Sequence, residues 1–348
     1  MKGLSGRIPL ILSTLICLVS VLSGIAALAV GDIEISASPS GEAGLSPLKD
    51  ILPPILSSSA APEQGDLAGS SLPAESVAVS ADPADAVGKI HSQFLSPYSA
   101  KLQYGGVYIK NSTGLDIDLK AELAAKLSLG IKKGSDPQVL IVHTHATESY
   151  MTEDRPFYTA ADKSRTTDNA KNVTAVGDTL AAVIEAGGYK VLHDRTHHDH
   201  PAYNGSYDRA YTTINEYLKK YPGIKIVIDL HRDSIAMSGN DKAKPVVEID
   251  GKKAAQVMLV VGSQTGSVTG FPNWKSNFRL AARFQQKMEK LYPGLPRQML
   301  FCSRRYNMHL TTGSMLLEIG TDSNTLEEAK YSAELAGKAL VALLGEIN

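Results

Sequence analysis

After residue 135 the chain alternates between short apolar runs and longer amphipathic segments. Apolar runs of this length predict buried strands, and apolar positions three or four residues apart predict helices that pack on them. Turn signals such as Gly187-Gly188, Pro222-Gly223 and Pro293-Gly294 end the helices. The expected strands are 139–142, 189–192, 224–230, 257–261 and 314–319, and the expected helices are 172–186, 207–221, 277–292 and 325–344.

Strands that alternate with helices are typical of an α/β domain. We therefore expect a doubly wound, mostly parallel sheet with flanking helices, in a catalytic domain that spans 136–348. The preceding segment, 89–135, contains an expected strand and a short helix, and it forms either a small lead-in subdomain or an extension of the main sheet. In such a sheet, functional sites lie at the carboxyl ends of the strands.

The first 30 residues have a different character. Residues 8–30 carry no charge and are long enough to cross a bilayer as a helix, with basic residues before them and acidic residues after them. The positive-inside rule then predicts that 1–30 form a cytoplasmic tip and a single transmembrane anchor, with the rest of the chain outside the cytoplasm. The alternative is a cleaved signal peptide, because Ala27-Leu28-Ala29 is typical of a cleavage site.

Composition indicates the character of residues 31–88 and excludes two classes of protein. Residues 31–88 are rich in Ser, Ala and Pro and bury too little apolar surface to offset the entropy of ordering, so they are expected to form a flexible tether. The 35 basic residues are balanced by 36 acidic ones, and no basic stripe indicates a nucleic-acid partner. The two cysteines, Cys17 and Cys302, exclude a disulfide framework.

Polar side chains that can bind a metal ion lie at the ends of three of the expected strands. His143, His145 and Glu148 come after the first strand, His231 follows the second, and Glu318 lies near the end of the third. Because the carboxyl ends of parallel strands meet at one edge, we expect these side chains to converge. Two imidazoles and a carboxylate with one open position are typical of a catalytic zinc site.

The ligand set itself stays open. Either His143 or His145 is the second imidazole, since residues two apart in an extended chain point to the same side. Glu148, in a His-x-x-Glu spacing, is preferred as the third protein ligand over Asp168, which could instead cap a helix. The His-rich tract at 197–200 is interpreted as solvated surface.

Glu318 and Arg232 are the candidate catalytic residues. A carboxylate between apolar neighbours is costly to bury without a partner, so Glu318 is expected to act as a base beside zinc-activated water. Arg232 would hold the developing oxyanion or a substrate carboxylate. The structural alternatives are an ion pair of Glu318 with Arg232 or Arg305, and a pairing of Arg232 with Asp233.

Taken in order, these motifs resemble the stage II sporulation protein P family of endospore-forming bacteria. The resemblance covers residues 136–348. It rests on the segments 142–150, 165–168, 172–173, 229–234, 305–307 and 317–320.

The resemblance implies an N-acetylmuramoyl-L-alanine amidase with endopeptidase activity on the cross-linked stem peptides of peptidoglycan. It implies a zinc-dependent amidase fold, with zinc held by the histidines of the His-Thr-His motif and by His231, and with Glu318 catalytic. Asp168 and Arg305, which lie in the shared segments, are assigned to substrate binding.

The resemblance also implies septal wall thinning and engulfment during sporulation, from the mother-cell membrane. The implied partners are stage II sporulation protein D, a lytic transglycosylase, and stage II sporulation protein M, a membrane scaffold. Two other functions are compatible with the residues. One is a zinc carboxypeptidase-like exopeptidase, and the other is an inactive wall-binding scaffold.

Overall fold

The computed structural model describes residues 81–347. The predicted anchor and nearly all of the predicted tether lie outside these residues. Within them, no helix combines the length and the apolar character that a bilayer span requires.

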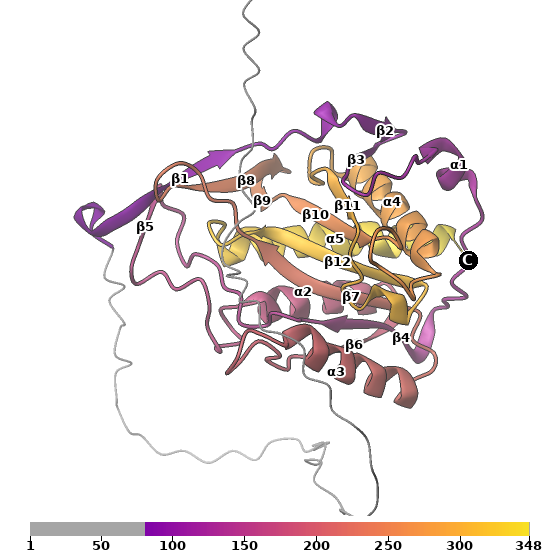
Figure 1. The fold of residues 1–348 in the computed structure, drawn as a ribbon. Helices are drawn as coiled ribbons and strands as arrows, with labels where there is room; N and C mark the ends of the chain where they lie inside the picture. The colour runs from indigo at the N-terminus through magenta and orange to yellow at the C-terminus, as the bar shows by residue number, and fades with distance from the viewer. Residues whose placement is uncertain (1–80, 348) are drawn as a thin grey trace, which may run out of the picture. The chain divides into compact units, whose positions relative to one another are not determined.

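An eight-stranded sheet forms the centre of the described chain (Figure 1). Its strands, in spatial order, are β2 (Leu102–Tyr104), β3 (Val107–Asn111), β11 (Met299–Cys302), β10 (Val257–Gly262), β12 (Gly313–Thr321), β7 (Ile226–Asp233), β4 (Gly134–Val142) and β6 (Tyr189–His193). The strands β6, β4, β7 and β12 run in one direction, and β10, β11 and β3 run in the other. The sheet is therefore mixed. The prediction of parallel pairing holds for β6, β4, β7 and β12 and for β10, β11 and β3, but it missed the reversal between β12 and β10 and the antiparallel edge strand β2. A buried strand has the same apolar pattern in either direction.

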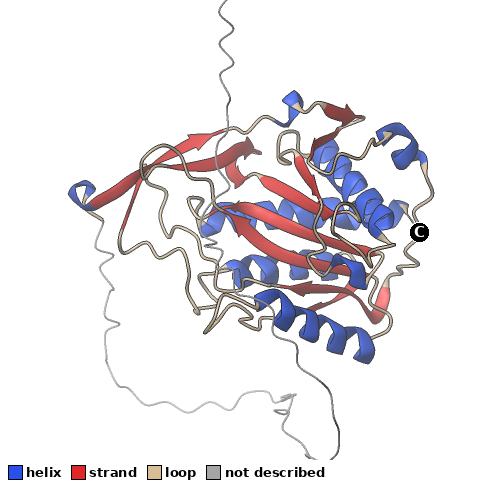
Figure 2. Ribbon diagram, viewed as in Figure 1, coloured by secondary structure: helices blue, strands red, loops and turns tan. Residues whose placement is uncertain are grey.

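Helices cover both faces of this sheet, as predicted (Figure 2). On one face pack α2 (Val173–Ala186), α4 (Trp274–Leu291) and α5 (Leu326–Glu346), and on the other packs α3 (Ser206–Lys220). The residues of β4 alternate accordingly. Val139 and Ile141 join the first core, whereas Leu140 and Val142 pack against α3.

A second, four-stranded sheet has the order β5 (Phe157–Thr159), β1 (Ala86–Gln93), β8 (Lys242–Ile249) and β9 (Lys252–Ala255). The segment 89–135 contributes most of β1 to this sheet, adds β2 and β3 to the main sheet, and ends after the short helix α1 (Leu119–Ala124). It therefore contributes strands to both sheets. Lysines and a proline interrupt β8, so no continuous apolar run marked it in the sequence.

Candidate functional site

The predicted cluster lies on the face of the main sheet that is turned away from α2, α4 and α5. His145 and Glu148 belong to the turn that follows β4, His231 lies within β7, and Glu318 lies within β12. Both strands continue beyond their apolar runs, so strand alternation sets the direction of His231 and Glu318. These two residues are register partners across the β7–β12 pair.

Two imidazoles and a carboxylate meet in this cluster. The rings of His145 and His231 face each other edge to face, with centroids 5.3 Å apart. Oε2 of Glu148 lies 3.4 Å from Nδ1 of His231 and accepts the backbone N–H of Arg232 at 3.2 Å. All three side chains are buried, so their charges interact with little screening by water.

The charges of this cluster are coupled. Burial lowers the pKa of His231, but the carboxylates of Asp229 and Glu148 outweigh burial and raise that pKa well above its usual value. In return, burial raises the pKa of Glu148, and contact with His231 brings the net pKa below its usual value. Burial and the neighbouring His231 lower the pKa of His145 to about 4. The two carboxylates thus favour the charged form of His231, whereas burial favours the neutral form of His145.

Glu318 is a partly buried acid with a pKa near neutrality. Its Oε2 atom is buried without a hydrogen-bond partner among residues 81–347. Burial raises the pKa of Glu318 to about 8, with help from Asp233 and Glu148 and against the effect of His231. No ion pair links Glu318 to Arg232 or Arg305 in the described chain. A carboxyl group tuned in this way suits general acid–base chemistry.

The donor types of the cluster fit zinc. Nδ1 of His145 and Nε2 of His231 are buried and lack hydrogen-bond partners within the described residues. Nε2 of His231 does lie 2.9 Å from Oδ1 of Asp229, but outside hydrogen-bond geometry. With Glu148 they make two imidazoles and a carboxylate, the donor set of many catalytic zinc sites. Among residues 81–347, no three His, Cys, Asp or Glu side chains are already arranged as a metal site.

The raised pKa of Glu318 predicts a pH-dependent stability of the metal-free protein. Between pH 4.5, the ordinary pKa of a glutamate side chain, and about pH 8, the folded carboxyl keeps a proton that the unfolded chain has lost. The contribution of Glu318 is therefore complete at low pH and is lost as the pH rises through 8, by at most about 1.4 kcal/mol per pH unit. Glu318→Gln should flatten this fall in urea unfolding measured from pH 5 to pH 9 with a chelator present. Parallel curves for the two proteins would contradict the assignment.

His143 lies on the opposite side of the sheet from the cluster. Its Nδ1 atom is 2.8 Å from the carbonyl oxygen of Leu230, and its Nε2 atom is 2.7 Å from Nε2 of His193, under α2. Burial, together with His193, lowers the pKa of His143 to about 3. The prediction that His143 and His145 share one side was wrong, because the chain leaves the extended conformation after Val142 and turns at 144–147.

Gly177 of α2 leaves the space that the His143–His193 pair occupies. A Cβ atom there would lie 2.6 Å from Nε2 of His193 and 2.9 Å from Nε2 of His143. We expect Gly177→Ala to lower the free energy of unfolding by about 1–3 kcal/mol, because both rings must shift within a packed interior. Gly345→Ala in α5 is the matched control, since an added Cβ there meets no described atom within 4 Å. Denaturant unfolding that shows equal stability for the two variants would refute this role.

The side chain of Arg232 serves the loop after β4 instead of the cluster. Its Nε donates to the carbonyl of Ser149 at 2.9 Å, its Nη2 to that of Ser164 at 2.6 Å, and its Nη1 to that of Asp233 at 3.3 Å. Arg232 follows His231 in β7, so its side chain points to the other side of the strand. The predicted oxyanion role is therefore replaced by a structural one, and only the backbone N–H of Arg232 reaches Glu148.

Asp168 and Arg305 also lie apart from the cluster. Asp168 is exposed, forms an ion pair with Lys171 at 3.2 Å and accepts the N–H of Ala170. Arg305 is exposed in the loop after β11, near His309. Within the described residues, no hydrogen bond or ion pair joins either side chain to His145, Glu148, His231 or Glu318. Their assignment to substrate binding gains no support from these positions.

Two carboxylates of the site escaped the sequence analysis. Asp229 accepts the N–H and the hydroxyl of Thr144 at 2.8 and 2.7 Å. Its position two residues before His231 on one strand was an available signal that both point to one face. Asp199 accepts hydrogen bonds from the hydroxyl of Thr147 and from Nη1 of Arg165, both at 2.6 Å, and lies 4.0 Å from Nδ1 of His145.

The interpretation of 197–200 as solvated surface was therefore wrong for its central residues. His198 and Asp199 are buried, and Nδ1 of His198 lies 2.8 Å from the carbonyl oxygen of His143. The composition of a polar tract does not show that tertiary contacts cover it.

Aromatic side chains shield one side of the cluster. The ring of Tyr203 stacks on His145 at a centroid distance of 4.4 Å, and Tyr207 meets the same imidazole edge-on at 5.6 Å. The guanidinium group of Arg165 lies over the ring of Tyr203, 4.9 Å from the ring centroid. Tyr203 is itself 54% exposed, so it separates a buried imidazole from solvent.

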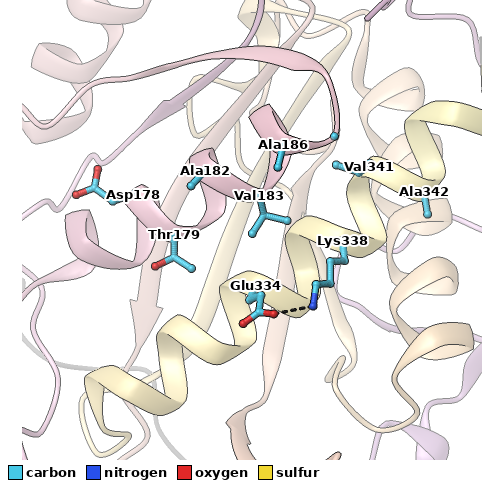
Figure 3. A pocket seen from close by; sticks show the side chains of 10 residues that line it. Asp178, Thr179, Ala182, Val183, Ala186, Glu334, Lys338, Val341 and Ala342 are labelled. Carbon is cyan, nitrogen blue, oxygen red and sulfur yellow. Dashed lines mark hydrogen bonds and ion pairs between the residues drawn. The ribbon is translucent and has the colours of Figure 1, made fainter.

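A separate cavity of about 820 Å³ lies between α2 and α5, on the far side of the sheet from the cluster (Figure 3). Apolar residues such as Ala182, Val183 and Val341 line it, and the ion pair between Glu334 and Lys338 lies at its edge. None of the cluster residues lines this cavity, so the volume of a cavity does not by itself identify the candidate site.

Comparison with known proteins agrees with the sequence motifs. The family model for stage II sporulation protein P matches residues 99–341. A curated stage II sporulation protein P of Bacillus subtilis (strain 168) is 30% identical over 215 residues, which are 58% of this chain and 50% of that protein. The chain thus spans about half the length of this relative.

Solved structures that match part of the chain at low similarity include two amidases. The CwlD amidase from Clostridioides difficile, in complex with the GerS lipoprotein, is 10% identical with a TM-score of 0.38, covering 60% of this chain and 98% of that one. The N-acetylmuramoyl-L-alanine amidase AmiC2 of Nostoc punctiforme is 11% identical with a TM-score of 0.36, covering 61% and 99%. The match of the family model over residues 99–341 confirms the resemblance seen in the motifs, and the chain belongs to the stage II sporulation protein P family.

Proposed function

We propose that this chain is a peptidoglycan hydrolase of sporulation, an N-acetylmuramoyl-L-alanine amidase that also cleaves cross-linked stem peptides. Family membership supports the substrate class. The observation that carries the reaction type is the Glu318 carboxyl, whose Oε2 is buried without a hydrogen-bond partner in the described chain and whose pKa is raised to about 8, beside two imidazoles and Glu148. An amide hydrolase needs such a group, because a proton must leave the attacking water and reach the departing nitrogen.

In this proposal His145, His231 and Glu148 would hold zinc. Zinc, when bound, would polarise the amide carbonyl and make a water molecule more acidic. Glu318 takes the proton of the water whose oxygen forms the new bond to the carbonyl carbon. The same carboxyl then donates that proton to the amide nitrogen as the carbon–nitrogen bond breaks. Its raised pKa suits both transfers near neutral pH.

For the setting of the reaction we propose the mother-cell membrane at the sporulation septum. The uncharged residues 8–30 support an anchor, and the family supports a role in septal wall thinning and engulfment. Stage II sporulation proteins D and M are the proposed partners on the same basis.

The activity is tested by digesting purified peptidoglycan with the full chain and reading the products by mass spectrometry. Stem peptides together with glycan strands that lack peptides are the expected products of an amidase. Release of single terminal amino acids would instead identify an exopeptidase. The absence of any product, together with the absence of bound metal, would leave a wall-binding scaffold.

Metal content separates the two histidines of the His-Thr-His motif. We expect His145→Ala and His231→Ala to lose the zinc that the wild-type protein retains after dialysis, because each removes one of three protein ligands. His143→Gln should keep it, since His143 lies under α2 and bonds to Leu230 and His193. Atomic emission of the purified variants measures this. Loss of zinc from His143→Gln with retention in His145→Ala would reverse the assignment.

A further inference from the structure

A second cavity lies directly beside Glu318. It has a volume of about 540 Å³, and we call it the β10–β11 pocket. The residues that line it come from β3, β7, β10, β11 and the segments before them. They are Phe94, Leu95, Ser96, Ser99, Lys110, Asp233, Met258, Arg297, Gln298 and Leu300.

The strand reversal explains why this pocket adjoins the candidate site. Met258 of β10 is the register partner of Glu318, and Glu318 is the register partner of His231. Because β10 and β11 run opposite to β12, their first residues lie at the same end of the sheet as the last residues of β7 and β12. Asp233, two residues beyond His231 on β7, lines the pocket as well. Two of the lining residues are thus close neighbours of the candidate site, Met258 across the strand pair from Glu318 and Asp233 two residues after His231.

The lining combines an apolar part with two cations. Phe94, Met258 and Leu300 supply the apolar surface. Arg297 is held by Asp233, with Nη1 2.9 Å from Oδ2, and its side chain keeps 12% of its surface exposed. A guanidinium group has five N–H donors, so this ion pair leaves others for a ligand.

Lys110 is the second cation. It lies on β3, in register with Leu300 of β11, and it is exposed. Within the described residues it forms no ion pair with an acidic side chain, and Asp233, the one carboxylate of the pocket, is taken by Arg297. The pocket therefore has a net positive charge and an uncommitted ammonium group.

We infer that the β10–β11 pocket binds the peptide part of the substrate through a carboxylate, with Lys110 as a specificity-determining residue. This inference rests on the proposed function. The stem peptides of peptidoglycan carry free carboxylates and short aliphatic side chains, which match a cationic pocket with an apolar lining. A bound peptide would then run from the amide beside Glu318 across β10 and β11 towards β3.

Binding is tested with the full chain carrying Glu318→Gln, so that no peptide is consumed. Isothermal calorimetry compares a stem tetrapeptide whose carboxylates are free with the same peptide fully amidated. The free form should bind up to about fivefold more tightly, the upper end of the range for a solvent-accessible ion pair. Adding Lys110→Glu should remove this preference, and Lys110→Arg should preserve it. Lys126→Glu, which makes the same charge change at an exposed lysine outside the pocket, should leave it intact.

Turnover of soluble disaccharide tetrapeptides by the otherwise wild-type chain provides the second measurement. Lys110→Glu should raise KM at least about fivefold with little change in kcat, since Lys110 touches the peptide and not the reacting amide. Unchanged KM and unchanged peptide affinity in an active enzyme would overturn the inference alone. If the wild-type protein hydrolyses nothing, the proposed function fails, and the calorimetric preference for the free carboxylates still decides whether the pocket binds them.

Discussion

Glu318→Gln should lower kcat/KM for peptidoglycan hydrolysis by about 10²–10⁴-fold, the usual contribution of a positioned general acid–base group. Glutamine keeps the size of the side chain and cannot accept the proton of the attacking water. Because Glu318 lies outside the three proposed ligands, the variant should retain its zinc. The substitution should also leave the fold intact, since it replaces a partly buried acid whose Oε2 lacks a partner in the described chain.

The measurement is initial-rate hydrolysis of purified peptidoglycan by wild-type and variant proteins with equal zinc content. A rate within tenfold of the wild type would exclude Glu318 as the base and leave Glu148 or Asp229 as the candidates. A matched control is Glu327→Gln, because Glu327 is an exposed glutamate at the start of α5, a helix that packs on the face of the sheet opposite the cluster. Its rate should equal that of the wild type.

Glu328→Ala should lower the free energy of unfolding by about 3–5 kcal/mol, because it removes one partner of a buried charge. The side chain of Lys244 is 1% exposed, and its Nζ atom lies 2.7 Å from Oε1 of Glu328 and 2.6 Å from Oδ1 of Asp154. Glu328 also completes a capping box with Thr325 at the start of α5. Loss of such a cap accounts for about 1 kcal/mol of the expected change.

The effect is large because this ion pair joins the two sheets. Lys244 belongs to β8 of the small sheet, and α5 packs on the main sheet. Glu327→Ala is the control, since its side chain is 83% exposed and pairs with Lys330 at 3.2 Å. That variant should differ from the wild type by no more than about 0.5 kcal/mol in denaturant unfolding. If the two alanine variants are equally stable, the buried pair contributes little.

The strands and helices that surround the site follow from local patterns. Each apolar run predicted as a strand lies in a strand of the main sheet, and each amphipathic segment after residue 135 forms the expected helix. These elements are recoverable because a strand buried on both faces must be apolar throughout, and a helix that covers it must be apolar on one side. The strands β1, β8 and β9 contain fewer apolar residues. The pairing of β1 with β8 joins segments that are about 150 residues apart in the chain.

Local sequence patterns predicted that one histidine of the His-Thr-His motif, His231 and Glu318 would lie close together, because the apolar runs beside them belong to neighbouring parallel strands. They also indicated the family, through motifs that are local runs of residues. Local patterns could not show that the chain turns after Val142, which sends His143 under α2 and leaves His145 in the cluster.

Tertiary structure alone decided the remaining features of the site. Strand alternation turned Arg232 away to bind the carbonyls of a loop, and the packing of α3 and its preceding loop brought Asp199 next to His145. The reversal between β12 and β10 placed the β10–β11 pocket beside Glu318. The physical reason is common to all three. Hydrophobic periodicity records which residues are buried within an element, whereas the direction of a strand and the partners of a loop depend on contacts between distant parts of the chain.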